Sequence, residues 1–498
     1  MQRTFSVKKV FFSINYKISQ AFLSVVSHLT PTEQLELRLV CKACNELLVK
    51  RGSPLLCKLQ FTVCNDESRD TLLNSVVPWE SISFRQYLVE KSLFGNENHF
   101  LTFRKRFAGT LKVLQMRESI LGMGRFVELI SFCTALEELY IFSCPALLHS
   151  GFEIINWHLF IPKFHANLSK LKTLAIEDAY HITDISLDAL TSEMTRLERF
   201  LLSTEVSRLP VNVIEKVVRN NAKSLTVLGL SGPDLSSTKK FFRSSQLERQ
   251  EVIHFWGKMA TLELPKLSDI HLSRMSLWNG FDFSNFLDRC KNLKKVLLSD
   301  MHLPSDIFAN CRKLRYSLEM LRIADCNLEQ RTVRCLTPYE NLKEIIFIHN
   351  NSTDKEDNRF SYPDVAPLFG SLRPLCTKLV FRCRFGSELI CLIAHNFPNL
   401  KVLDFQMVEN IKPQELLSLR FLKNLKILVL KGCEIMDSTF FPYSDNDKDL
   451  AHLCSLFRDG LQGTLSMNGI YSEFLTGRVY WLLLVYEQIY GTCLSEWS

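Results

Sequence analysis

A nine-residue pattern of apolar side chains recurs along most of this 498-residue chain and strongly limits what it can fold into. The pattern reads L-x-x-L-x-L-x-x-C/N, and full copies include LEELYIFSC from Leu136, LEMLRIADC from Leu318 and LKILVLKGC from Leu425. Most neighbouring copies start 24–28 residues apart, a spacing typical of a solenoid of stacked units. The twelve copies begin at Leu111, Leu136, Leu171, Leu197, Leu225, Leu267, Leu293, Leu318, Leu342, Cys376, Leu400 and Leu425.

The alternation within each copy predicts a short strand with one buried face. Leu139 and Ile141 should point inward, and one copy cannot bury them alone, but stacked neighbours can. The sequence therefore predicts an α/β fold, a curved leucine-rich-repeat solenoid with a parallel sheet on its concave face. Two longer intervals, around Ser231–Lys266 and Asn351–Leu375, are polar enough to be loops.

Cysteine recurs at two fixed places in the repeat. Cys144, Cys326 and Cys433 take the ninth position, where we expect each to fill the turn or to bond the backbone. Cys133 and Cys290 stand three residues before a copy, at the end of the preceding helix. No signal peptide is recognisable, so we expect all sixteen cysteines to be free thiols.

The first sixty residues differ from the repeats in pattern and in charge. Phe22, Val25, Val26 and Leu29 recur at helical spacing, and Thr30–Glu33 has the Thr, Pro and Glu of a helix start. Nine Lys or Arg against three Glu place six of the seven net positive charges in this segment. A unit of about 45 residues has a marginal core, so its remaining apolar surface should meet a partner, and the charge suggests an acidic one.

Cys41 and Cys44 raise three alternatives for the helix around them. A C-x-x-C pair can bind zinc or do redox chemistry, but Cys57 and Cys64 do not form a second pair of suitable spacing. The helix can also be ordinary core, or it can be a docking surface for another protein.

The stretch Phe22–Phe61, FLSVVSHLTPTEQLELRLVCKACNELLVKRGSPLLCKLQF, resembles an F-box. It departs from the F-box pattern in having Lys17-Ile18 for the opening Leu-Pro, and Cys44 and Cys57 for two tryptophans. Followed by cysteine-rich leucine repeats, it resembles the F-box–LRR family. The resemblance implies a face that docks on the Skp-type linker protein of a cullin–RING ubiquitin ligase. That face would comprise Phe22, Val25, Val26, Leu29, Glu33, Leu35, Leu39, Val40, Cys41 and Lys42.

The resemblance implies four segments along the chain. They are an F-box-like helical domain over 14–61, a linker or N-terminal cap over 62–110, leucine-rich repeats over 111–440 and a C-terminal cap over 441–498. The implied function is that of a substrate-recognition adaptor of an SCF-type E3 ligase. The alternative is a protein-binding scaffold with a degenerate F-box and no ligase role. An extracellular leucine-repeat receptor would need a signal peptide, a membrane span and paired cysteines.

Substrate should meet the strand residues that alternate with the inward leucines. Tyr140 and Phe142 are the strongest candidates, because outward aromatic residues are enriched at interfaces; a solvated strand face is the alternative. Ile346 and Ile348 also point outward. The candidate substrate-binding residues are Glu138, Tyr140, Phe142, Arg199, His271, Arg322 and Arg382.

No motif indicates bond chemistry. The chain has no Walker-type loop and no H-E-x-x-H or G-x-S-x-G motif, and its twelve histidines are scattered. We expect no catalytic residue, no metal and no cofactor. Nearly neutral repeats argue against nucleic-acid binding, and no apolar run approaches the ~20 residues of a membrane span. We expect a location in the cytoplasm or the nucleus.

Overall fold

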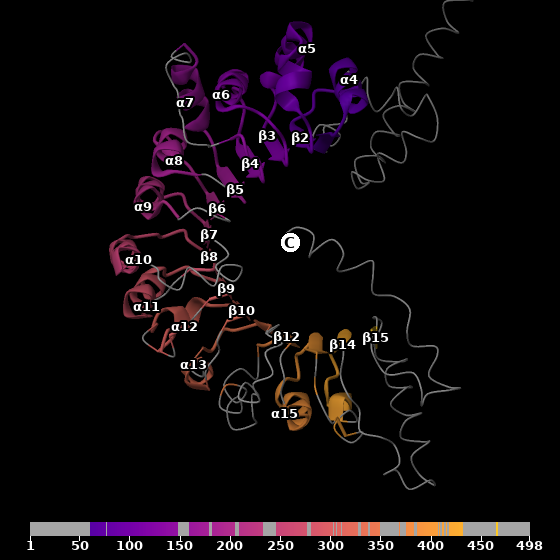
Figure 1. The fold of residues 1–498 in the computed structure, drawn as a ribbon. Helices are drawn as coiled ribbons and strands as arrows, with labels where there is room; N and C mark the ends of the chain where they lie inside the picture. Colours follow the sequence, from indigo (N-terminus) through magenta and orange to yellow (C-terminus); the bar gives the residue numbers. More distant parts are fainter. Residues whose placement is uncertain are drawn as a thin grey trace, which may run out of the picture. The chain divides into compact units, whose positions relative to one another are not determined.

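The structure is a computed structural model that describes residues 60–147 and 159–431, with gaps of which the longest are 233–245 and 349–367, and Leu465–Ser466. The chain divides into two compact units, Met1–Leu225 and Thr226–Ser498. In each unit the strands lie side by side in chain order, and the helices cover one face of the sheet (Figure 1). The face opposite the helices is called the concave face below.

The first unit alternates strands and helices from its first described residue. All of its strand pairs are parallel. Its strands are β1 Gln60–Val63, β2 Ser81–Arg85, β3 Val113–Arg117, β4 Glu138–Phe142, β5 Thr173–Glu177 and β6 Arg199–Ser203. Its helices are α4 Asp66–Asn74, α5 Glu97–Phe103, α6 Met123–Phe132, α7 Ile161–Leu168, α8 Asp184–Thr191 and α9 Val211–Asn220, with π-turns η2 Glu90–Phe94 and η3 Arg104–Ala108.

The second unit continues the same alternation, again with parallel strand pairs. Its strands are β7 Val227–Ser231, β8 Asp269–Ser273, β9 Lys295–Ser299, β10 Met320–Ala324, β11 Glu344–Ile348, β12 Lys378–Arg382, β13 Val402–Gln406, β14 Ile427–Lys431 and β15 Leu465–Ser466. Its helices are α10 Gln246–Met259, α11 Gly280–Arg289, α12 Leu314–Ser317, α13 Gln330–Cys335 and α15 Glu388–Asn396, with the 3-10 turn η7 Leu419–Phe421.

The predicted repeat and the observed strands coincide. Each of the twelve copies begins two residues before a strand, from β3 to β14. The first residue of every copy is buried, and even Leu425 is only 5% exposed. Leu139 and Ile141 are 0% and 2% exposed, as their inward position requires. The predicted fold class, a leucine-rich-repeat solenoid with a parallel sheet, is confirmed for the described residues.

Two further strands precede the twelve copies. The strand β1 spans the predicted boundary at 61/62 between the F-box-like domain and the linker or cap, and β2 lies within the latter. The two strands pair in register with each other, and β2 pairs with β3. Trp79, which is 6% exposed, takes the place before β2 where the other copies have Leu or Cys. The substitution of Trp for Leu explains why the pattern alone did not reveal β2.

The interval Ser231–Lys266 is not wholly a loop, and this prediction is wrong for its second half. The helix α10 occupies Gln246–Met259. Phe255, Trp256 and Met259 are each at most 2% exposed, because their helical spacing brings them together on the buried side. Trp256 contacts Phe283 of the next helix with ring centroids 4.8 Å apart.

Backbone strain recurs at the end of the strands. Seven non-glycine residues have a positive φ of 49–52°, and each follows a strand directly. In six of them the backbone N–H donates to the last carbonyl of the following strand, as from Glu118 to Phe142 at 2.8 Å. This bond offsets the unfavourable left-handed conformation. The seven residues are Gln86, Glu118, Ser143, Asp178, Arg274, Asp300 and Asp325.

Charged residues of alternating sign stand one residue before successive strands. Lys112 Nζ lies 2.9 Å from Glu80 Oε2, and Lys172 Nζ lies 2.7 Å from Glu137 Oε2. In the second unit Lys343 Nζ lies 2.7 Å from Glu319 Oε2. These ion pairs are largely exposed, so each contributes little stability. The alternation of charge sign from strand to strand, however, disfavours pairing between strands that carry like charges.

The described cysteines behave as the sequence predicts. All nine are free thiols. Cys144 Sγ donates to the Phe142 carbonyl at 3.3 Å, and Cys133 Sγ donates to the Leu129 carbonyl at 3.3 Å at the end of α6. Burial raises the pKa of Cys133 to about 12, so this thiol stays protonated and packs as core.

Buried asparagines connect consecutive repeats. Asn221, 1% exposed, donates through Nδ2 to the carbonyls of Met194 and Val217, each at 2.9 Å. Its Oδ1 accepts from the Leu197 N–H at 2.8 Å. These bonds satisfy backbone groups that would otherwise be buried without partners.

Replacing Asn221 with Leu should lower the free energy of unfolding by about 2–4 kcal/mol, because backbone groups lose their partners while apolar bulk is kept. Urea denaturation of the full chain measures the change. The neighbouring Asn220 is exposed, and Asn220→Leu is the matched control, with an expected change within about 0.5 kcal/mol. Equal losses in the two variants would contradict this role for Asn221.

Candidate functional site

The concave face is built from the first, third and fifth residues of each strand. In β4 the second and fourth residues are buried, whereas Glu138, Tyr140 and Phe142 are partly exposed. The same alternation is seen in β3, β8 and β9. Solenoids use such extended concave surfaces to bind other molecules, so this face is the candidate binding surface of the repeats.

Tyr140 and Phe142 form an aromatic pair on the concave face of the first unit. Their ring centroids lie 6.0 Å apart with an interplanar angle of 25°. Tyr140 Oη donates to Glu138 Oε2 at 2.8 Å. Burial, together with this carboxylate, raises the pKa of Tyr140 to about 12, so the phenol remains a hydrogen-bond donor.

The fifth positions of β3, β4 and β5 bring together a cation, a ring and a carboxyl group. Arg117 pairs in register with Phe142, and Phe142 pairs with Glu177. The Arg117 Cζ lies 5.3 Å from the centroid of the Phe142 ring, within range of a cation–π contact. Burial, and to a smaller extent the charge of Asp178, raise the pKa of Glu177 to about 7, although Arg117 opposes the shift.

Arg199 extends this group along the first positions of the strands. The register aligns Glu138 with Thr173, and Thr173 with Arg199 on β6. Two strand spacings separate Glu138 from Arg199 by about 10 Å. The first unit therefore brings together four predicted residues, Glu138, Tyr140, Phe142 and Arg199. Sequence reasoning missed Arg117, although it stands in its copy where Phe142 stands in the next.

The other three predicted residues lie on the concave face of the second unit. His271 on β8 aligns through Leu297 on β9 with Arg322 on β10. Arg382 on β12 donates to Asp404 Oδ2 on β13 from Nε at 3.2 Å and from Nη2 at 2.9 Å. These three residues therefore form a set separate from the aromatic group of the first unit.

The ten residues of the expected docking face all lie outside the described residues. They are Phe22, Val25, Val26, Leu29, Glu33, Leu35, Leu39, Val40, Cys41 and Lys42.

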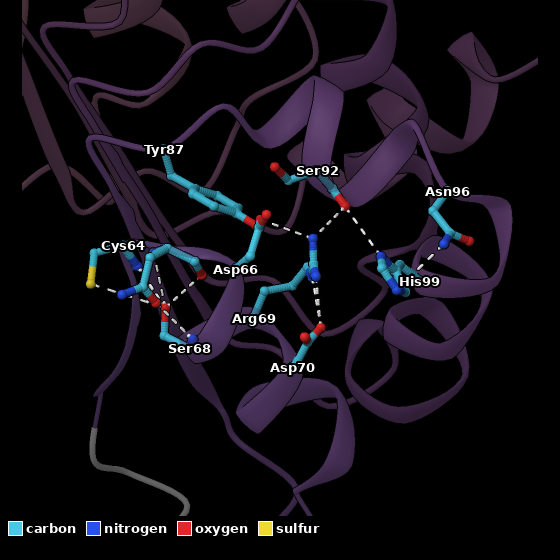
Figure 2. A network of polar contacts seen from close by, with 10 residues as sticks. Cys64, Asp66, Ser68, Arg69, Asp70, Tyr87, Ser92, Asn96 and His99 are labelled. Atoms are coloured by element: carbon cyan, nitrogen blue, oxygen red, sulfur yellow. Dashed lines mark hydrogen bonds and ion pairs between the residues drawn. The ribbon is translucent and has the colours of Figure 1, made fainter.

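A polar network near the start of the described chain is structural. Tyr87 Oη and Arg69 Nη1 both donate to Asp66 Oδ1 at 2.9 Å (Figure 2). Arg69 Nη1 also lies 3.4 Å from the Ser92 carbonyl, which His99 Nδ1 approaches at 3.3 Å. The hydrogen bond from Tyr87 is the main reason that the pKa of Asp66 is lowered. Each group has a partner, so the network connects α4, η2 and α5.

The described residues hold no group of three or more His, Cys, Asp or Glu side chains that could bind a metal ion. None of their helices is long and apolar enough to cross a membrane.

Comparison with known proteins yields no family match: no protein-family model and no curated protein matches the chain. A crystal structure of the Rad7 and Elc1 complex in yeast is similar over 97% of this chain and 97% of that chain, with 13% identity and a TM-score of 0.42. An internalin, inlF, from Listeria monocytogenes is similar over 68% of this chain and 83% of that chain, with 16% identity and a TM-score of 0.38. The leucine-rich-repeat assignment rests on the strand register and the repeat itself.

Replacing Tyr140 and Phe142 together with Ser should remove protein partners that co-purify with the full chain, because it deletes the aromatic surface of β4. The melting temperature should stay near that of the unaltered protein, since both side chains are partly exposed. Tyr316→Ser, at a 65% exposed aromatic residue in α12, is the control. A collapse of the melting temperature would show that the pair belongs to the core, because truncating a core aromatic side chain lowers the free energy of unfolding by about 3–5 kcal/mol.

Glu177→Gln should stabilise the protein more at pH 8 than at pH 5. The pKa of Glu177 is about 7 in the folded protein, against an ordinary value of 4.5. Between pH 4.5 and pH 7 the folded state therefore keeps a proton on Glu177 that the unfolded state has released. The stability that this proton provides is present below pH 4.5 and lost as the pH rises through 7. Melting curves across this window measure the difference, with the exposed Glu193→Gln as control. If the stability difference between Glu177→Gln and the unaltered protein did not change with pH, the raised pKa of Glu177 would be contradicted.

Proposed function

We propose that this protein is the substrate-recognition adaptor of an SCF-type cullin–RING ubiquitin ligase. In this role the segment Phe22–Phe61 docks on the Skp-type linker protein, and the concave faces of the repeats bind the substrate. The observation that carries the proposal is the order of the two parts: a segment that resembles an F-box precedes an array of leucine-rich repeats. The proposed role is one of binding and assigns no covalent chemistry to the chain.

Charge and surface chemistry support separate roles for the N-terminal segment in linker docking and for the repeats in substrate binding. Most of the net positive charge lies in the first sixty residues, which suits the acidic linker that the F-box resemblance implies. The repeats carry their aromatic and charged groups on the sheet face opposite the helices, as in the group around Tyr140. A substrate held there would be presented to the ligase without any chemistry by this chain.

A second candidate function is a binding scaffold that recruits no ligase. It is favoured by Cys44 and Cys57, which stand where F-boxes have tryptophan. Loss of two large aromatic residues from a docking face would weaken binding substantially. Binding of the linker protein by the full chain separates the two candidates.

Replacing Leu35 and Val40 together with Glu should weaken binding of the full chain to the purified linker protein by about 100-fold or more, because two charges would be buried without partners. The pair Gln34→Glu and Asn45→Glu adds the same charge to polar positions of the same segment and should bind nearly as well. The circular dichroism of the repeats should be unchanged in both.

Two outcomes would contradict the adaptor role. One is undetectable binding by the unaltered chain, which would favour the scaffold. The other is equal binding by the Leu35 and Val40 variant, which would show that this face does not meet the linker.

A further inference from the structure

Arg322 is an unusual residue of the concave face in the second unit. It is the third residue of β10 and aligns with Leu297 on β9 and with Ile346 on β11. The side chain is half-buried. Among the described residues it has no hydrogen-bond or ion-pair partner, although a guanidinium carries five N–H donors.

Its electrostatic surroundings are unfavourable. Burial lowers the pKa of Arg322, and the like charge of Arg382 lowers it further, with only a smaller opposing effect from Asp325. Neighbouring cations of the same face are paired: Lys295 Nζ lies 3.3 Å from Asp269 Oδ1, and Lys378 Nζ lies 3.6 Å from Glu344 Oε2. A half-buried charge without a hydrogen-bond acceptor is costly, unless a ligand supplies one.

Arg382, the fifth residue of β12, lies two strands from Arg322, and its charge acts on Arg322. Its Nε and Nη2 both donate to Asp404 Oδ2, and the side chains of Arg382 and Asp404 are 26% and 6% exposed. The ion pair neutralises the charge of Arg382 in part and orients its guanidinium. The pair also shows that this part of the sheet accommodates a carboxylate against a guanidinium.

An apolar strip extends from Arg322 along the third positions of the neighbouring strands. Ile346 and Val380 follow Arg322 across β11 and β12, and they are 7% and 6% exposed although they occupy third positions on the concave face. Leu297 continues the strip on the other side of Arg322 and is partly exposed. A side chain that reaches Arg322 would therefore be flanked by hydrocarbon.

We propose that Arg322 binds the carboxylate of an Asp or Glu side chain in a partner protein, with Arg382 two strands away and the strip of Leu297, Ile346 and Val380 as its apolar flank. A guanidinium and a carboxylate form two parallel hydrogen bonds, and the low exposure strengthens them. This subsite rests on the proposed function in so far as the concave face binds a protein.

The balance of charge favours a carboxylate over a phosphate. Arg382 is ion-paired with Asp404, whereas Arg322 has no bonded anion among the described residues of this group. A single negative charge meets that requirement. A phosphate dianion would add repulsion with Asp404 and Asp325 without a further cation to offset it.

Retention of peptide libraries on the immobilised full chain tests the subsite. The probes are three blocked hexapeptide libraries with mixed apolar and small flanking residues and a fixed central Glu, Gln or phosphoserine. The unaltered protein should retain the Glu library about tenfold better than the Gln library, the effect of one charged hydrogen-bonded contact. Arg322→Gln should abolish that preference.

Arg312→Gln is the matched control, because Arg312 is exposed in the same unit and the change removes the same charge. It should keep the preference. The melting temperature of Arg322→Gln should be equal to that of the unaltered chain or higher, since the residue has no described partner to lose. A clear fall would assign Arg322 a structural role and overturn the proposal.

Three further outcomes would overturn it: no preference for Glu in the unaltered chain, the same preference in Arg322→Gln, or a stronger preference for phosphoserine. Binding of the linker protein is measured on the same samples. Linker binding without a Glu preference would reject the subsite alone. A Glu preference without linker binding would reject the ligase role and leave the subsite standing.

Discussion

The sharing of inward side chains between neighbouring repeats is the interaction on which the rest of the structure depends. A strand of five residues offers two buried positions, such as Leu139 and Ile141, and these contact the equivalents on either side. No repeat has a core of its own, so helices, turns and strand register are stabilised only within the stack. The buried Asn221 extends this dependence to a backbone carbonyl of the preceding repeat, that of Met194.

Because the inward positions are committed to packing, chemical variety is confined to three positions in each strand. The register then decides which of them meet. Residues 25 and 35 positions apart in sequence become neighbours, as Arg117, Phe142 and Glu177 do across three strands. Diagonal contacts such as that of Arg382 with Asp404 add combinations that no single copy contains. Recognition by such a surface is a property of adjacent repeats.

The sequence was sufficient to predict the repeat, its inward residues and the face of each candidate side chain, because one period governs all of them. It was insufficient where a position was filled by another residue type, as with Trp79 before β2, or where a helix lay within an insertion, as with α10. The low exposure of Ile346 depends on its neighbours on β10 and β12, which a single strand does not encode. The partner-free state of Arg322 likewise requires the register of several strands.

The left-handed turns give the array a direction. The N–H of a turn such as Glu118 bonds to the last carbonyl of the strand that follows, never of the one before. If a repeat is removed from the C-terminal side, the turn of the preceding repeat loses the hydrogen bond that offsets its strain. If a repeat is removed from the N-terminal side, every remaining turn keeps its bond. Within each compact unit, loss of order should thus propagate backwards along the chain, and deletions should be tolerated asymmetrically at the two ends.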